Sequence, residues 1–289
     1  MTALRALERA SQGWRVSLLR HEDELLRGAA HGVDLLCLPA EEAAGAAAGR
    51  YLVGFAASQR AVEAALRLRF EVFNVELREG LAESWRTGLD RDPFDAAMAH
   101  LVLIERASGA LAGTYRLQTE AMARASGLGF YSAQEYDLTG MSSWLPHATE
   151  LGRACVGREH RSLAAVMALW QGIRGFLRVS GQRYVFGCCS LTTQDPDDGW
   201  RALRTIRAQG ALHSQLWLPA TRAYSCGDPA RADDPALGAL ALPKLFRTYL
   251  RLGTQVVSEP ALDRDFGTVD FLVLQDRLRV NLSALEGDA

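Results

Sequence analysis

The sequence predicts an α/β chain of the α+β kind, in which one mixed, largely antiparallel sheet is flanked by helices. Its strand-like and helix-like runs follow the order strand, helix, hairpin, strand, helix, strand, helix and late strand. This order is neither the alternation of a doubly wound protein nor the all-strand pattern of a β-sandwich. Hydrophobic residues make up 48% of the 289 residues and charged residues 23%, which is typical of a soluble globular protein.

The chain is expected to divide into an N-terminal extension (1–50), a main domain (51–280) and a polar tail (281–289). Within the extension, the apolar patch Val33–Leu38 is compatible with an added strand, and residues 41–50 have the composition of a linker. The N-terminus lacks the long apolar core of a signal peptide. No apolar run reaches the roughly 18 residues that a membrane-spanning helix needs.

Charge and cysteine content limit the classes of function. The net charge of −2 gives no reason to expect nucleic-acid binding. Lys244 is the sole lysine among 32 basic residues, so we expect any anion site to be built from arginine. The five cysteines are odd in number and form no metal-ligand spacing. We therefore expect no metal, reduced core thiols at Cys155, Cys188 and Cys189, and a cytoplasmic location.

The first elements of the main domain are a strand at Tyr51–Ala57 and a helix over residues 60–79. The helix is predicted because apolar residues recur at every third or fourth position from Val62 to Leu77. Arg69, Phe73 and Glu76 share a neighbouring face of this helix. Arg69 either extends its stem along the apolar face or points into a cleft.

An acidic loop follows, and it crowds Asp90, Asp92 and Asp95 into six positions. Carboxylates this close repel one another, so the loop favours a cationic partner such as an amine substrate; a solvated acidic turn is the alternative. The spacing and the closing glutamate of a calcium loop are absent. Two apolar runs joined by a short turn containing Gly109 then predict a hairpin, which places Arg116 on its second strand.

Residues 149–179 form the stretch around which the chain is organised. Glu150 and Arg153 are predicted to lie on a strand, and a helix is predicted from Leu163 to about residue 179. Apolar side chains mark one face of that helix at Leu163, Val166, Trp170, Ile173 and Leu177. A short basic loop therefore connects the strand to an amphipathic helix.

That loop, Gly157–Ser162, predicts a phosphate site. Ser162 is placed to cap the helix. Free backbone N–H groups and the helix dipole favour an anion at a helix start, and Arg158 and Arg161 add forked donors. An ordinary strand–loop–helix unit with solvated arginines is the alternative.

The C-terminal part is predicted to contain two strands, 184–191 and 268–274, and two helices, 195–210 and 243–252, the second ended by Gly253. Gly187 in the first strand indicates a bulge or a close backbone approach. Residues 210–242 are irregular. Arginines at 201, 204 and 207 form either a docking face for an acidic partner or a solvated face.

Several motifs together resemble the GNAT acyltransferases. Within them the chain is most similar to the L-ornithine Nα-acyltransferases of bacterial ornithine-lipid synthesis, the hemolysin-like branch that is related to autoinducer synthases and N-acyl amino acid synthases. The resemblance covers about residues 60–275 and rests on an ordered set. The set is RFEVFNVELREG (69–80), DRDPFDAAMAHLVL (90–103), GTYRL (113–117), GFYSAQEYDL (129–138), ELGRACV (150–156), RSLAAVMALWQGI (161–173), YVFGCCSL (184–191), LPKLFRTYLRLG (242–253) and DFGTVDFLVL (265–274).

The resemblance implies a GNAT fold and transfer of a 3-hydroxy fatty acyl group from acyl carrier protein to the α-amine of L-ornithine, the first step of ornithine-lipid synthesis. Glu150 would be the general base. The implied substrate-binding residues are Arg69, Phe73, Asp92, Asp95, Arg116, Phe130 and Arg153. In this set, the aspartates would hold ammonium groups and Arg116 or Arg153 would pair with the α-carboxylate.

The resemblance also implies the partners. The phosphopantetheine phosphate of the carrier protein would lie at Gly157, Arg158, Arg161 and Ser162, with no tightly bound cofactor. Because the product is a lipid, peripheral contact with the inner membrane is implied as well. Two alternatives stay open: a synthase of N-acyl amino acids or acyl-homoserine lactones with another amine acceptor, and a GNAT-like binding module without turnover. Cys155 is disfavoured as a nucleophile because no histidine shows a clear pairing pattern with it.

Overall fold

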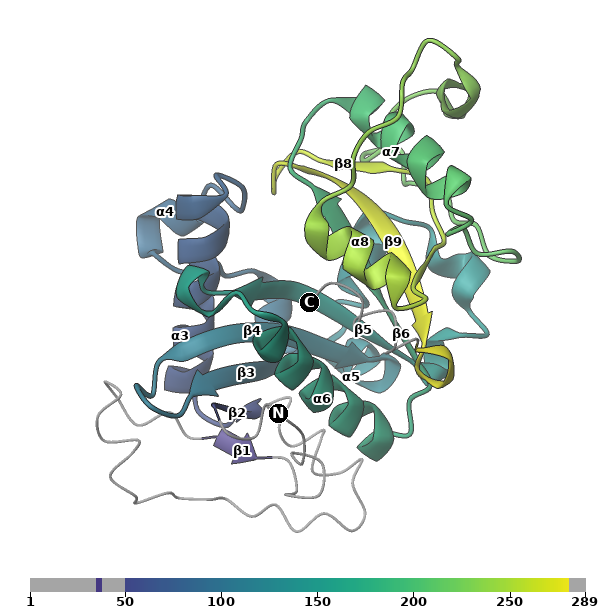
Figure 1. Ribbon diagram of the computed structural model, residues 1–289. Helices are drawn as coiled ribbons and strands as arrows, with labels where there is room; N and C mark the ends of the chain where they lie inside the picture. The colour runs from purple at the N-terminus through teal and green to yellow at the C-terminus, as the bar shows by residue number, and fades with distance from the viewer. Residues whose placement is uncertain (1–34, 38–49, 281–289) are drawn as a thin grey trace. The chain divides into compact units, whose positions relative to one another are not determined.

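The computed structural model describes residues 35–37 and 50–280 (Figure 1). The predicted N-terminal extension lies outside the described residues apart from strand β1 (Leu35–Cys37) and Arg50, and the predicted tail 281–289 also lies outside them. Strand β1 pairs antiparallel with β2 (Tyr51–Ala56). The added strand that the patch at 33–38 suggested is therefore present over three residues.

The chain forms two compact units. The first unit contains the described residues up to Gln118 together with Leu151–Gln182. The second unit contains Thr119–Glu150 and the described residues from Arg183 onward. Strand β5 (Ala148–Val156) contributes its first three residues to the second unit and the rest to the first.

The first unit is built on antiparallel strands in the order β1, β2, β3, β4, with β5 next to β4. Strands β3 (Ala99–Glu105) and β4 (Leu111–Thr119) form the predicted hairpin. Its connecting turn contains Gly109 at φ 66°, a left-handed conformation that glycine adopts without steric cost. The hairpin places Arg116 on β4 as predicted.

Helices α3 (Gln59–Phe70) and α6 (Leu163–Val179) both pack on strands β2 and β3 (Figure 1). On the face toward α3, Ala65 packs with Val102 and Ile104. On the other face, the backbone of α6 at Gly172 comes close to Leu101. Because both faces of β3 are covered, the strand is buried at every residue but the last, and this explains its unbroken apolar sequence.

The close approach at Gly172 leads to a testable prediction. A methyl group at this position would lie 2.7 Å from Leu101 Cδ1 and 2.8 Å from Val53 Cγ2. We expect Gly172→Ala to lower the free energy of unfolding by about 1–3 kcal/mol through overpacking, although alanine favours helices. Urea denaturation would measure the loss, with exposed Arg174→Ala on the same helix as the control. A stabilised Gly172→Ala variant would contradict the packing described.

The second unit is built around two long strands, β6 (Tyr184–Leu191) and β9 (Thr268–Asp276), which pair antiparallel over their length. Strand β9 also pairs with β7 (Gln255–Val256) and β8 (Ala261–Asp263). The first residues of β5 pair parallel with β6, and α6 provides the crossover that a parallel pair requires. The pairing runs through Gly187 without a shift, so this glycine marks no bulge.

Two hydrophobic clusters cover the two faces of β6 and β9. One cluster is centred on Trp200, Phe246 and Phe271, and helices α7 (Pro196–Ala208) and α8 (Lys244–Arg251) contribute to it. The other contains Tyr136 and Phe186 and is completed by segments that follow the short helix α5 (Glu120–Ser126). Residues 210–242 are irregular as predicted, apart from a 3₁₀ turn at Pro229–Asp233 and isolated bridges.

The α7 arginines contact their own unit. Arg201 pairs with Asp198, Arg207 pairs with Asp233, and Arg204 donates a hydrogen bond to the carbonyl of residue 234. The guanidinium groups that the sequence offered for docking an acidic partner are therefore engaged within the unit.

The predicted mixed, largely antiparallel sheet with flanking helices is confirmed. Within the described ranges, no helix is both long and apolar enough to cross a bilayer.

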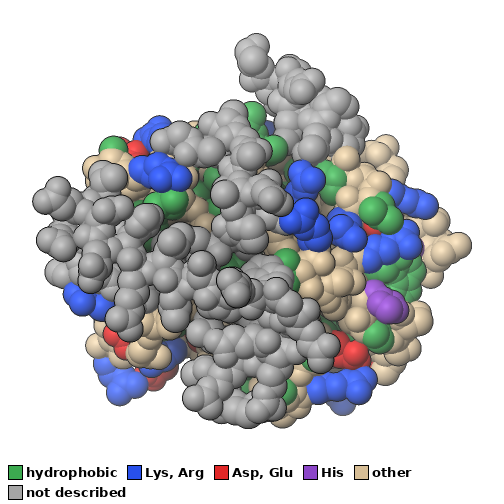
Figure 2. Space-filling view, turned by 90° about the horizontal axis from the view of Figure 1, so that it is seen from below, with side chains coloured by type: hydrophobic (Ala, Val, Ile, Leu, Met, Phe, Trp, Pro, Cys, Tyr) green, Lys and Arg blue, Asp and Glu red, His purple; other side chains and the backbone are tan. Residues whose placement is uncertain are grey.

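Among the described residues, more carboxylates than guanidinium groups are buried. On the face shown in Figure 2, lysine and arginine are more visible than aspartate and glutamate. The buried charged residues include many carboxylates, namely Glu79, Asp90, Asp95, Glu135, Glu150, Asp263 and Asp270. Buried carboxylates need counter-charges, hydrogen bonds or protons, because an isolated buried charge is costly. The contacts of each buried carboxylate therefore decide whether it is ionised.

Candidate functional site

The segment that carries Arg69 and Phe73 changes its helical form between them. Helix α3 ends at Phe70, and a π-helix follows over Glu71–Glu76. Phe73 lies on this π-helix and is buried. The sequence predicted one continuous helix here, because a wider turn leaves the apolar spacing nearly unchanged. Single π turns inside helices are frequently found at functional sites.

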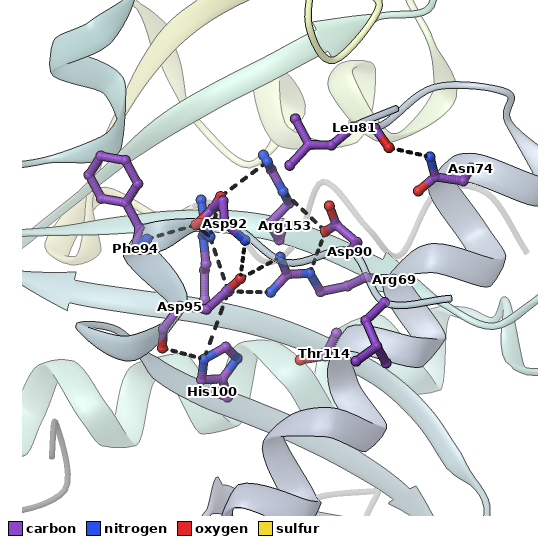
Figure 3. Close-up of polar contacts among 12 residues, drawn as sticks. Arg69, Asn74, Leu81, Asp90, Asp92, Phe94, Asp95, His100, Thr114 and Arg153 are labelled. Atoms are coloured by element: carbon purple, nitrogen blue, oxygen red, sulfur yellow. Dashed lines mark hydrogen bonds and ion pairs between the residues drawn. The ribbon is translucent and has the colours of Figure 1, made fainter. Parts of the chain in front are cut away.

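Arg69 lies at the centre of a buried ion network in the first unit (Figure 3). Its Nε donates to Asp90 Oδ2 at 2.6 Å, and its Nη1 donates to Asp95 Oδ1 at 2.6 Å. The side chains of Arg69 and Asp90 are at most 1% exposed. The guanidinium therefore points into the acidic loop and does not extend to solvent.

Arg116 and Arg153 complete the network from strands β4 and β5. Arg116 Nη1 lies 2.7 Å from the Asp92 carboxylate and 3.1 Å from Asp95 Oδ1. Arg153 donates to Asp90 and Asp92, each at 3.2 Å. Three guanidinium groups thus face three carboxylates, which balances the charge of the acidic loop. Because forked guanidinium groups match carboxylates, the network fixes the loop against α3, β4 and β5.

The network controls the ionisation of its members. Burial alone would raise the pKa of the Asp95 carboxyl, but the charges of Arg69 and Arg116 outweigh burial and hold it below the ordinary value. His100 Nε2 lies 2.9 Å from the Asp95 carbonyl oxygen, and burial lowers the pKa of this imidazole. Asp95 is therefore ionised and His100 is neutral at pH 7.

The lowered pKa of Asp95 predicts acid sensitivity. A carboxyl whose pKa is lower in the folded state stabilises the fold fully above its unfolded pKa, near 3.8 here. That contribution falls as the pH drops below 3.8 and is lost once the pH passes the folded pKa. We expect the free energy of unfolding to decrease below about pH 4 by urea titration. Asp95→Asn should show a weaker decrease, and an equally steep one would contradict the assignment.

The backbone at Arg153 is strained. It adopts φ 50° within a strand, and Arg78 is the other non-glycine residue with a positive φ in the described ranges. Such a conformation costs about 1–3 kcal/mol and persists where the surroundings impose it. The two ion pairs of the Arg153 side chain provide this constraint. The sequence contains no signal for this positive φ angle in β5.

A cavity of about 360 Å³ borders the network in the first unit. Phe55, Val62 and Met98 line it with apolar surface, while Asp92 and Asp95 contribute polar atoms. The predicted role of these aspartates in holding ammonium groups is untested. Their charges are nevertheless already matched by arginines, which leaves the network little need for a further cation.

Glu150 and Phe130 lie together in the second unit. The two Glu150 carboxylate oxygens accept hydrogen bonds from the backbone N–H groups of Tyr131, at 2.9 Å, and Ser132, at 2.7 Å. Tyr131 begins a 3₁₀ turn that ends at Gln134. Phe130 precedes this turn and packs edge-on against Phe186, with ring centroids 5.1 Å apart. Glu150 is 2% exposed. The carboxylate therefore anchors the 131–134 turn, and each oxygen can accept more than one hydrogen bond.

The predicted phosphate loop has the expected cap but fewer available donors. Ser162 Oγ accepts a hydrogen bond from Ala165 N, which confirms the cap. Gly157 N donates to a carbonyl of β4, and Arg158 starts a short 3₁₀ turn and is exposed. Both Arg161 Nη atoms bind the Glu76 carboxylate, at 2.6 and 2.8 Å. Phosphate binding stays a prediction in which Arg158 is the more accessible arginine.

Two parts of the site differ from the sequence-based assignment. Asp90 was identified only as part of a crowded loop, yet it binds both Arg69 and Arg153. The sequence pattern did not identify His100, which contacts the network through the Asp95 carbonyl oxygen.

Burial raises the pKa of the Cys155 thiol to about 12, which agrees with its rejection as a nucleophile. The four described cysteines are free thiols.

Comparison with known proteins gives a consistent set of relatives. Residues 68–171 match the family model of an acetyltransferase (GNAT) domain. The chain is 32% identical over 231 residues to the L-ornithine N(alpha)-acyltransferase of Rhizobium meliloti, covering 76% of this chain and 77% of that protein. It is 32% identical over 241 residues to the enzyme of the same name from Brucella abortus, covering 78% and 84%.

Solved structures show more distant likenesses. The N-acyl amino acid synthase FeeM from uncultured soil microbes is 10% identical with a TM-score of 0.45, covering 83% of this chain and 99% of that chain. The AHL synthase LasI is 9% identical with a TM-score of 0.42, covering 78% and 89%. At this identity and score, neither adds to the match with the sequence relatives.

Proposed function

The chain belongs to the L-ornithine N(alpha)-acyltransferase family, and from this premise we propose that it joins a fatty acyl group to the α-amine of L-ornithine. The observation that carries the proposal is the match to the Rhizobium meliloti enzyme over three quarters of both chains. The acyltransferase domain model supports the same class of reaction. The product would be an N-acyl ornithine, the precursor of an ornithine lipid.

The reaction needs a base and a leaving thiol. The amine attacks the thioester carbon, a C–N bond forms, and the C–S bond breaks when the tetrahedral intermediate collapses. The amine proton passes to a base, and the leaving thiolate takes up a proton from that base or from water, so that the net products are the amide and the free thiol. We assign Glu150 as the base, acting directly or through one water. Its two backbone hydrogen bonds hold the carboxylate in one orientation, which a general base requires.

The donor that we propose is an acyl group on the phosphopantetheine arm of acyl carrier protein. Helix α6 has the 17 residues and the capped start that an anion site at a helix N-terminus needs. Arg158 is exposed beside that start. The protein would hold no resident cofactor, since the thioester itself activates the acyl group. Because the product is a lipid, the proposal includes peripheral contact with the inner membrane.

The assay for this proposal uses the purified full-length chain with 3-hydroxyacyl-loaded acyl carrier protein and L-ornithine. Release of the carrier thiol and formation of the amide are measured together, with acyl-CoA as the competing donor. We expect amide and thiol in equal amounts with the carrier protein. Amide formed only from acyl-CoA would overturn the donor, and amide formed only with another amino acid would overturn the acceptor.

A further inference from the structure

A second group of buried acidic residues lies in the second unit, separate from the ion network. Glu135 ends a 3₁₀ turn, Cys188 lies on β6 and Asp270 lies on β9. Polar atoms of these three side chains lie within 4.8 Å of one another. Because Ser190 pairs with Asp270, Cys188 lies two residues along the same face of the sheet. We call these three residues the acidic triad.

Asp270 has no arginine partner among the described residues, unlike Asp90 and Asp95 in the ion network. Glu135 is 1% exposed and Asp270 is 4% exposed. Asp270 Oδ1 has no hydrogen-bond partner, and none of the ion pairs in the described part of the chain includes Asp270. Burial, together with the nearby charge of Asp263, raises the pKa of Asp270 to about 6. Two close buried carboxylates favour either a shared proton or a bound cation.

The surroundings of the acidic triad include Glu150 and two partly exposed side chains. The Cys188 thiol donates to Glu135 Oε2 at 3.5 Å and is only partly buried. Burial is the main reason that the pKa of this thiol is raised, and the charges of Glu135, Asp270 and Glu150 add to it, so Glu150 lies near the triad within the second unit. Tyr224 is also partly exposed, and its pKa is raised by burial and then by nearby negative charges that include Asp263 and Glu135. Cys188 and Tyr224 are therefore the partly exposed side chains past which an acceptor would approach the triad.

We propose that Glu135 and Asp270 bind the side-chain ammonium group of the acceptor amino acid. This inference rests on the proposed function, because ornithine carries a second amine at the end of its side chain. An ammonium group is a compact charge with three donors, and Asp270 Oδ1 is an unused acceptor for one of them. The acidic triad thereby selects diamino acids, whereas the carboxylates of the acidic loop 90–95 already bind arginines.

The experiment compares two acceptors, L-ornithine and L-norvaline, which has the same carbon chain without the terminal amine. The full-length chain, Asp270→Asn and Glu135→Gln are assayed, with Asp265→Asn as the control because Asp265 is an exposed carboxylate of the same unit. We expect Asp270→Asn and Glu135→Gln to lower kcat/KM for ornithine by about 30-fold or more, mainly through KM. Their activity with norvaline and both activities of Asp265→Asn should change less than about 3-fold.

The outcomes separate this inference from the proposed function. Equal losses with ornithine and norvaline in both variants would overturn the inference and leave the function intact. No turnover of ornithine by the unaltered chain would overturn the function and the inference together. A stoichiometric divalent metal in the purified chain that Asp270→Asn loses would also overturn the inference, since the triad would then be a metal site. If Asp270→Asn fails to fold, as judged by thermal melting, Glu135→Gln decides.

Discussion

Replacing Glu150 with glutamine is expected to lower the rate of acyl transfer by about 10²–10⁴-fold, the range that loss of a general base produces. Glutamine has nearly the same shape but cannot take the amine proton. Its amide keeps one acceptor oxygen, so one of the two backbone N–H groups of the 131–134 turn loses its partner. We therefore also expect a loss of about 1–3 kcal/mol in stability.

The rate is measured as release of the carrier thiol at saturating ornithine, and folding is followed by urea denaturation. Glu120→Gln is a matched control, because Glu120 lies in the same unit and forms only an exposed ion pair with Arg124. A Glu150→Gln variant that is folded and keeps more than about a tenth of the rate would show that another group serves as the base. The anchoring role of Glu150 would then be its main one.

Removal of the Arg69 charge should have the largest effect on stability. In Arg69→Met, Asp90 and Asp95 would lose the guanidinium that binds both of them. Breaking a buried ion pair by removing one partner costs about 3–5 kcal/mol, because the remaining charges stay buried. We expect Arg69→Met to lower the free energy of unfolding by at least this amount, a large share of the stability of an ordinary domain.

Urea denaturation of the variant measures this loss, and Arg67→Met is the control because Arg67 is exposed on the same helix turn. Combining Arg69→Met with Asp90→Asn should restore part of the stability, since two guanidinium groups then face two carboxylates. If the single variant were as stable as the unaltered chain, the ion network would not hold the acidic loop in place.

The sequence was sufficient to predict the bounds of an element wherever that element has a clear pattern of its own. The helix predicted at 163–179 and the strand predicted at 184–191 have the bounds of α6 and β6, because amphipathic spacing and β-branched or aromatic runs are local properties. The π-helix at 71–76 was missed because its apolar side chains continue the stripe of α3. Strand β7 is two residues long and β8 three, too short to show a period.

The site was predicted less completely, since ion pairing depends on tertiary placement. The crowded aspartates indicated a cationic partner, and the partners are arginines of the same chain. Arg116 lies 21 positions from Asp95 in the sequence and Arg69 lies 26 positions from it. Arg161 was assigned to phosphate, yet Glu76 occupies its fork from a residue 85 positions away. The acidic triad joins three distant segments, and no spacing in the sequence relates them.

Lipid mass spectrometry tests the central claim most directly. A bacterium that lacks aminolipids would be analysed before and after it expresses the full chain, with Glu150→Gln as the inactive control. The proposed function predicts a new N-(3-hydroxyacyl)ornithine species that is absent with the variant. A new acyl amide of another amino acid, or none at all despite soluble expression, would contradict the assignment of this chain as an ornithine acyltransferase.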